Sequence, residues 1–169
     1  KDLTNLSPGL RVVTTGGGVN ADISMRGLKR VPIGDGALDL ATGAMTPIGD
    51  KAKAIAYGQV DYAPDGALWV LSDEGSDYQR LGTLDPATGK FTPRAPAEKW
   101  DVETFKISSD GRFIAYVVNE AGISRVRLLD PVTGKSRTVE SLPAGVVGSL
   151  DVSDWGEIGL SLSSARSPS

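Results

Sequence analysis

Short apolar runs separated by glycine-containing turns form the pattern of residues 57–163. Leu68–Leu71 and Phe113–Val118 are continuous apolar runs, and such runs predict strands that are covered on both faces. Arg125–Leu129 alternates polar and apolar residues, as expected of a strand with one wet face. The pattern therefore predicts an all-β chain without a substantial helix.

Two sequence markers recur with one spacing. Asp65-Gly66 returns 45 residues later as Asp110-Gly111, and the same slot is then filled by Trp155-Gly156. Asp85-Pro-Ala-Thr-Gly89 returns after the same interval as Asp130-Pro-Val-Thr-Gly134. A period of about 40 to 50 residues is typical of one blade of a β-propeller. We expect the later full repeat to copy the earlier one position for position.

The repeats predict a partial β-propeller of about three and a half four-stranded antiparallel blades in one segment, residues 1–169. Gly9 and Gly43 are 34 residues apart, against 23 between the corresponding glycines of the full repeats, so the first blade is expected to be irregular, with a long loop around Gly16–Arg30. The chain starts at Lys1 without an initiator Met, and we expect the natural N-terminus to precede it. The predicted blades are 7–50, 57–95, 102–142 and an incomplete 146–163.

The turns have a predicted structural role. In the Asp-Pro-x-Thr-Gly turns, the aspartate is expected to accept hydrogen bonds from its own turn, and the closing glycine to adopt a positive φ. The residues to which we assign this role are Asp65, Gly66, Asp110, Gly111, Asp85, Gly89, Asp130 and Gly134.

Composition excludes several kinds of chemistry. The chain has no His and no Cys, which removes the Ser-His-Asp triad, thiol nucleophiles, disulfides and zinc sites built from these ligands. The net charge of −3 implies no basic face, which argues against nucleic acid or an anionic membrane as the main partner. No apolar run approaches the length of a transmembrane helix. The lack of Cys fits the cytoplasm and the bacterial periplasm equally, so localisation stays open. No cofactor is expected.

An acidic loop and one tryptophan allow a specific functional interpretation. Asp73, Glu74 and Asp77 supply the oxygen ligands that Ca²⁺ takes, but they lack a recognised calcium-loop spacing, and a solvated loop is the preferred interpretation. Trp155 occupies the Asp slot of a turn, and it is a candidate contact surface.

The lack of His leaves one enzymatic alternative, glycoside hydrolysis by paired carboxylates. Asp61, Glu103 and Asp151 fall at or near equivalent positions of the first strands, which line the central channel of a propeller. Plain solvation of the channel explains the same residues, and we prefer it.

The blade sequences resemble a known family. Ala63–Val70 and Ser108–Gly122 match a "Ser-Pro-Asp-Gly, apolar strand, Asn-Glu-x-Gly" signature, and Leu129–Lys135 matches the end of the third strand. This signature resembles the propeller repeats of prolyl oligopeptidase family serine peptidases and of TolB-like periplasmic propellers, over roughly residues 57–163. In the peptidases the propeller restricts access to a separate α/β-hydrolase domain with a Gly-x-Ser-x-Gly motif. That motif does not occur here, so the resemblance carries over no catalytic residue.

The resemblance implies a non-catalytic propeller segment that gates peptide access to a catalytic domain outside this chain. Its partners would be the rest of the propeller and that domain, and peptides would pass through the ring. The alternative is a TolB-like module that binds a protein on the propeller face. Because propellers close with four to eight blades, a second copy could also complete the ring, and we expect the isolated chain to self-associate through its open ends.

Overall fold

The computed structural model describes residues 30–33, 36–39, 45–47 and 55–164. In this part of the chain it contains thirteen strands and no helix, and therefore no helix that could cross a membrane. Sheet pairing is antiparallel throughout. The strands are β1 Arg30–Ile33, β2 Gly36–Asp39, β3 Met45–Pro47, β4 Tyr57–Tyr62, β5 Leu68–Ser72, β6 Arg80–Asp85, β7 Lys90–Pro93, β8 Val102–Ile107, β9 Ile114–Glu120, β10 Ile123–Leu129, β11 Ser136–Thr138, β12 Val146–Val152 and β13 Ile158–Ser163.

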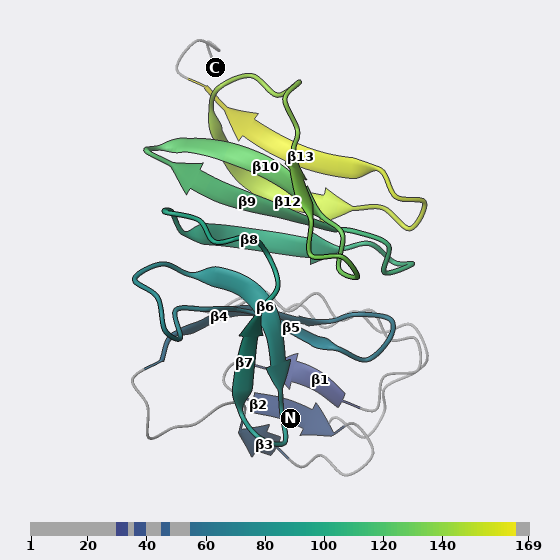
Figure 1. Cartoon of the computed structure of the whole chain (residues 1–169). Coiled ribbons are helices and arrows are strands. Elements are labelled where there is room, and N and C mark those ends of the chain that lie inside the picture. Colours follow the sequence, from purple (N-terminus) through teal and green to yellow (C-terminus); the bar gives the residue numbers. More distant parts are fainter. Residues whose placement is uncertain (1–29, 34–35, 40–44, 48–54, 165–169) are drawn as a thin grey trace, which may run out of the picture.

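The strands form four sheets in which sequence neighbours are also spatial neighbours. The sheets are β1–β2–β3, β4–β5–β6–β7, β8–β9–β10–β11 and β12–β13, and we call them the first to fourth blades. Figure 1 shows them stacked in chain order, from β1–β3 at the bottom to β12–β13 at the top. The first strands β4, β8 and β12 approach one another from blade to blade. This arrangement confirms the predicted fold class, an all-β partial propeller.

The core lies between the blades, because the second strand of a full blade is buried on both faces. In β5, Trp69 and Leu71 pack toward the third blade, while Leu68 and Val70 pack on the opposite face. In β9 the same division holds between the second blade and the fourth. A continuous apolar run therefore supplies two interfaces at once, as its sequence predicts. On β9 the residues facing the second blade are Ile114, Tyr116 and Val118, and those facing the fourth are Ala115 and Val117.

The repeats do not align position for position, which corrects the sequence interpretation. In the second blade Tyr62 pairs with Leu68, whereas in the third Ile107 pairs with Ile114. The turn of the third blade thus holds one residue more, and it is closed by a hydrogen bond from the Ser108 amide to the Phe113 carbonyl at 3.0 Å. The Asp-Gly marker keeps its interval because the extra residue follows it. The extra residue shifts β9 by one position against β5, whereas Leu128 of β10 stands 45 residues after its equivalent, Thr83 of β6, so the interval is restored before the second marker.

The fourth blade has one apolar face and one small, polar face. Ile158, Leu160 and Leu162 alternate along β13 with glycine and serine, and Ile158 and Leu160 pack against the third blade. Gly159 and Ser161 occupy the positions of Trp69 and Leu71 in the second blade. The outward face of this blade therefore lacks the apolar side chains that cover the equivalent face of the second.

The predicted blade ranges stay predictions, although strands occur in each of them. The range 7–50 holds β1, β2 and β3, while the expected long loop around Gly16–Arg30 falls, apart from Arg30 itself, outside the described residues.

Candidate functional site

The first strands carry an irregularity at the same place in each of the last three blades. The pairing register shifts between Tyr57 and Val60, between Val102 and Thr104, and between Val147 and Ser149. A β-bulge leaves a residue unpaired and re-aims its side chain. Gln59 of β4, Glu103 of β8 and Gly148 of β12 lie at these bulges. The first strands, which we call the inner strands, carry further polar side chains between the bulges and the turns, and they form the candidate functional surface of this chain.

Gln59, at the bulge of β4, connects two blades. Its Nε2 donates to the Phe105 carbonyl at 2.6 Å, and its Oε1 accepts from the Phe105 amide at 3.1 Å. The same oxygen accepts from Thr104 Oγ1 at 2.8 Å. All three bonds are partly buried, so the amide group satisfies backbone groups that the bulged edge strand leaves open.

Nearer to the turns than Gln59, charged side chains of alternating sign follow one another across the inner strands. We call them the polar row; it consists of Asp61 on β4, Lys106 on β8 and Asp151 on β12, at the 45-residue interval. Lys106 Nζ lies 4.0 Å from Asp151 Oδ1. Both aspartates also accept the amide of the following residue, at 2.8 Å for Asp61 and 2.9 Å for Asp151.

The structure bears on the glycosidase alternative, which rests on the carboxylates of Asp61, Glu103 and Asp151. Glu103 lies at the other end of β8, three residues or about 10 Å of strand from Lys106. Its Oε1 accepts a hydrogen bond from Asn119 Nδ2 at 2.7 Å. Asp61 and Asp151 lie on strands separated by β8, and Asp151 pairs with a lysine. The structure therefore brings opposite charges together and keeps Glu103 apart from the two aspartates.

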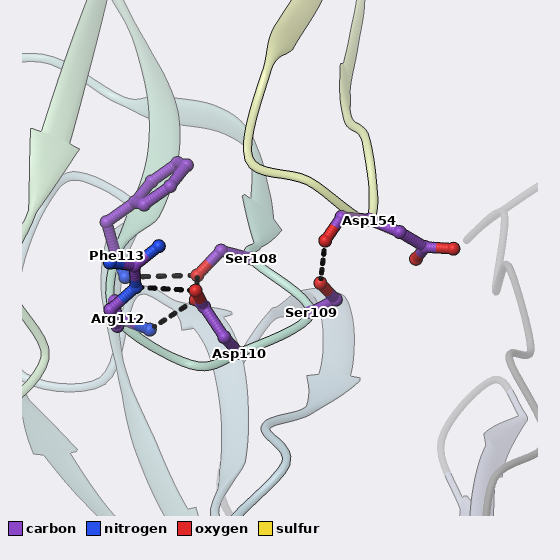
Figure 2. A network of polar contacts seen from close by, with 6 residues as sticks. All are labelled: Ser108, Ser109, Asp110, Arg112, Phe113 and Asp154. Atoms are coloured by element: carbon purple, nitrogen blue, oxygen red, sulfur yellow. Dashed lines mark hydrogen bonds and ion pairs between the residues drawn. The ribbon is translucent and has the colours of Figure 1, made fainter.

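Figure 2 shows the Asp-Gly turn of the third blade. Asp110 Oδ1 accepts from the Arg112 amide at 3.0 Å and from Ser108 Oγ at 2.9 Å, and Oδ2 accepts from Arg112 Nε at 2.5 Å. These hydrogen bonds, led by the Arg112 amide, lower the pKa of Asp110 to about 2. Asp65 makes the equivalent amide contact, at 3.0 Å with Ala67. The closing glycines, Gly66 and Gly111, have φ of 87° and 70°.

The Asp-Pro-x-Thr-Gly turns are also held by hydrogen bonds to their aspartate side chain. Asp85 accepts from the Ala87 amide at 2.9 Å and from Thr88 Oγ1 at 2.8 Å, and these bonds lower the pKa of its carboxyl. Asp130 accepts from the amides of residues 132 and 133, at 2.8 and 3.1 Å, and the Thr133 amide contributes most to its lowered pKa. Gly89 and Gly134 both have φ of 69°. In each case the aspartate side chain organises the turn.

Trp155 is the most solvent-exposed aromatic side chain among the described residues, at 76%. Its indole Nε1 donates to Glu157 Oε2 at 2.8 Å. Where Asp65 and Asp110 accept the amide two residues on, here Ser153 Oγ accepts the Glu157 amide at 2.9 Å. The turn is therefore closed without an aspartate, and the indole is left on the surface.

Adjacent turns touch from blade to blade. Ser109 Oγ donates to the Asp154 carbonyl at 2.8 Å (Figure 2), and Gly111 lies against the ring of Pro64. These contacts give the blade stack a continuous surface at this end, which we call the turn face. Trp155 lies on it.

The acidic loop shows local hydrogen bonding. Asp73 Oδ1 accepts the Ala56 amide at 2.8 Å, and the Glu74 amide donates to Ser72 Oγ at 3.1 Å. No three acidic, His or Cys side chains gather into a metal-binding group among the described residues.

Sequence reasoning missed an ion-pair group on the third blade. Arg127 of β10 pairs with Glu98, from the connection before β8, and with Glu120 at 2.6 Å. Burial raises the pKa of Glu98, although the Arg127 charge opposes this. It also missed Gln59, for which one signal exists: Gln59 and Thr104 stand at the repeat interval.

Stacked antiparallel blades, two of them four-stranded, with polar inner strands define the chain as a partial β-propeller. No family model matches the sequence, and the search of curated proteins found no match. The fold is similar to that of a prolyl endopeptidase, with 22% identity and a TM-score of 0.56 over 70% of this chain and 17% of the endopeptidase. A tricorn protease aligns with 20% identity and a TM-score of 0.49, over 72% of this chain and 12% of its own.

The extracellular domain of a putative hybrid two-component system from B. thetaiotaomicron is also similar, with 13% identity and a TM-score of 0.51 over 78% of this chain and 20% of that one. The chain thus spans a fifth or less of each of these proteins. The resemblance to the propeller of prolyl oligopeptidase family peptidases is supported at the level of the fold.

Proposed function

We propose that this chain is a non-catalytic part of the β-propeller of a prolyl-oligopeptidase-like serine peptidase, in which the ring gates peptide access to a catalytic domain outside this chain. The observation that carries the proposal is the polar row on the inner strands, where Lys106 lies beside Asp151. A hydrated, charged lining suits a passage for extended peptides, and a narrow ring would exclude folded proteins by size.

Composition supports a structural and not a chemical role. Without a His anywhere in the sequence, no serine of this chain has an imidazole to take its proton. The fold similarity to a prolyl endopeptidase covers 17% of that enzyme, so peptidase activity is proposed for the whole protein.

Substitution of Lys106 in the polar row tests the gate in the complete protein. Lys106→Trp introduces bulk at the passage, and we expect kcat/KM for a peptide of about ten residues to fall relative to that for a short chromogenic substrate. Val132→Trp is the matched control, because Val132 is 91% exposed on a turn of the outer part of its blade. Equal effects of both variants on both substrates would contradict the gate. So would a reading frame without a Gly-x-Ser-x-Gly hydrolase domain.

Trp155 favours a second candidate function, a TolB-like module that binds a protein on the turn face. An indole that is 76% exposed is a typical anchor of a protein interface. This function predicts that a defined partner, once identified, loses affinity on Trp155→Asn and keeps it on Val146→Asn. The converse result would assign binding to the edge of the fourth blade.

The proposed propeller needs further blades, either from the same polypeptide or from a second copy. The small residues Gly159 and Ser161 on the outward face of the fourth blade favour the same polypeptide, because two copies meeting there would bury little apolar surface. Light scattering of the 169-residue chain distinguishes the two: a stable dimer that persists at micromolar concentration would support closure by a second copy.

A further inference from the structure

A hollow of about 560 Å³ opens between the second and third blades. Because antiparallel strands alternate in direction, the β5–β6 loop, the β7–β8 connection and the β9–β10 turn lie opposite the turn face, and we call this end the loop face. The hollow draws on all three of these segments. Its lining includes Tyr78, Trp100, Asp101, Glu103 and Asn119.

Hydrogen bonds to backbone groups hold the walls of the hollow in place. Asp101 Oδ1 accepts the Gln79 amide at 2.8 Å, and the Gln79 carbonyl accepts the Val102 amide at 3.0 Å. The Asn119 amide donates to the Asp101 carbonyl at 3.2 Å. Residues from two blades are thus fixed relative to one another, so a ligand would meet a preformed site.

The side chains of the hollow combine aromatic surface with negative charge. Trp100 is 42% exposed and Tyr78 is 38% exposed, so both rings present apolar surface at the hollow. Asp101 and Glu103 add two carboxylates, and no Lys or Arg belongs to the lining. At this end the β5–β6 loop adds the three carboxylates of Asp73, Glu74 and Asp77, against the two cations of Arg80 and Lys99, so negative charge prevails.

We propose that this hollow binds the cationic side chain of a peptide, an arginine guanidinium or a lysine ammonium, with the aliphatic stem against Trp100 and the charge at Glu103. The ring packs against the apolar stem of such a side chain, and the carboxylate supplies a charge-assisted hydrogen bond to its cationic head. The site lies on the loop face, away from both the turn face and Trp155. The inference goes beyond the proposed gate and does not depend on it.

The test uses blocked ligands that carry charge only on the side chain. N-acetylarginine amide is titrated into the full chain, followed by the Trp indole NMR signals, and N-acetylcitrulline amide serves as the neutral isostere. We expect the arginine ligand to bind at least about tenfold more tightly, with affinity falling as salt is raised. A blocked Gly-Arg-Gly tripeptide should bind at least as tightly as the arginine amide. Equal binding of arginine and citrulline ligands, or exclusion of the tripeptide, overturns the proposal.

Two substitutions test where in the hollow the ligand binds. Glu103→Gln removes the charge but keeps an oxygen that accepts from Asn119 Nδ2, so the local fold is retained, and we expect affinity for N-acetylarginine amide to fall about three- to tenfold. Trp100→Ala should weaken it by a similar factor, while Trp155→Ala, at an exposed tryptophan on the other face, should leave it unchanged. Loss of affinity in Trp155→Ala, or full affinity in Glu103→Gln with unchanged thermal stability, would overturn the assignment.

Discussion

Gln59 of one blade holds the backbone of Phe105 in the next, donating through Nε2 at 2.6 Å and accepting through Oε1 at 3.1 Å. Phe105 is itself fully buried between the two blades. The apolar interface supplies most of the contact between blades, because burial of apolar surface is the main favourable term in folding. The amide clamp fixes the alignment of the inner strands, on which the polar row depends.

Gln59→Ala should destabilise the chain by about 1–3 kcal/mol, since it leaves the partly buried amide and carbonyl of Phe105 without these partners. Thr104→Val removes one of the three bonds and keeps the shape, so its cost should be about 1 kcal/mol or less. Urea unfolding measures both. Equal stability of Gln59→Ala and the parent chain would show that the clamp does not contribute.

Gly134→Val should destabilise the third blade by about 1–3 kcal/mol, because φ is 69° there and valine is strained in that region. A Cβ at this position would also lie 3.2 Å from the Arg94 carbonyl oxygen. Gly159→Ala is the matched control, with open space around its Cβ, and it should change stability by less than about 0.5 kcal/mol. Unchanged thermal stability of Gly134→Val would show that the turn assignment is wrong.

Much of the blade architecture could be predicted because turn chemistry and burial act locally. The Asp-Gly markers mark the turns, and the apolar runs at Leu68 and Phe113 mark strands covered on both faces. The extra residue in the third turn escaped prediction because it follows Gly111, so that the marker spacing conceals it. The pairing of Ile107 with Ile114 and the hydrogen bond from the Ser108 amide to the Phe113 carbonyl show it.

The candidate site was less predictable, for a different physical reason. A glutamine on an inner strand has the same sequence appearance whether it is solvated or, like Gln59, bonded across to the next blade. The hollow is assembled from three loops, and the separation of Tyr78 from Asn119 along the chain gives no local signal. Glu103 was predicted as a channel carboxylate, and the structure places it at this hollow.

Trp155→Asn should leave stability within about 0.5 kcal/mol of the parent, since Asn can accept the Glu157 amide as Asp accepts it in the other turns. Its effect should instead fall on recognition by any partner of the turn face. Thermal unfolding and partner titration, measured on one preparation, separate the two. A large loss of stability would show that the indole supports the turn and is no free contact surface.

Asp110 gives the chain a defined acid sensitivity. Hydrogen bonds from the Arg112 amide, then from the Ser108 hydroxyl and the Arg112 side chain, lower the pKa of Asp110 from 3.8 to about 2 in the folded state. A lowered folded-state pKa stabilises the fold above the unfolded pKa, and this stability is lost as pH falls from about 4 to about 2. Asp110→Asn keeps an acceptor without a titratable group, so its stability should vary less over this window than that of the parent. Parallel unfolding curves of the two proteins at pH 5, 3 and 2 would contradict the role assigned to this carboxylate.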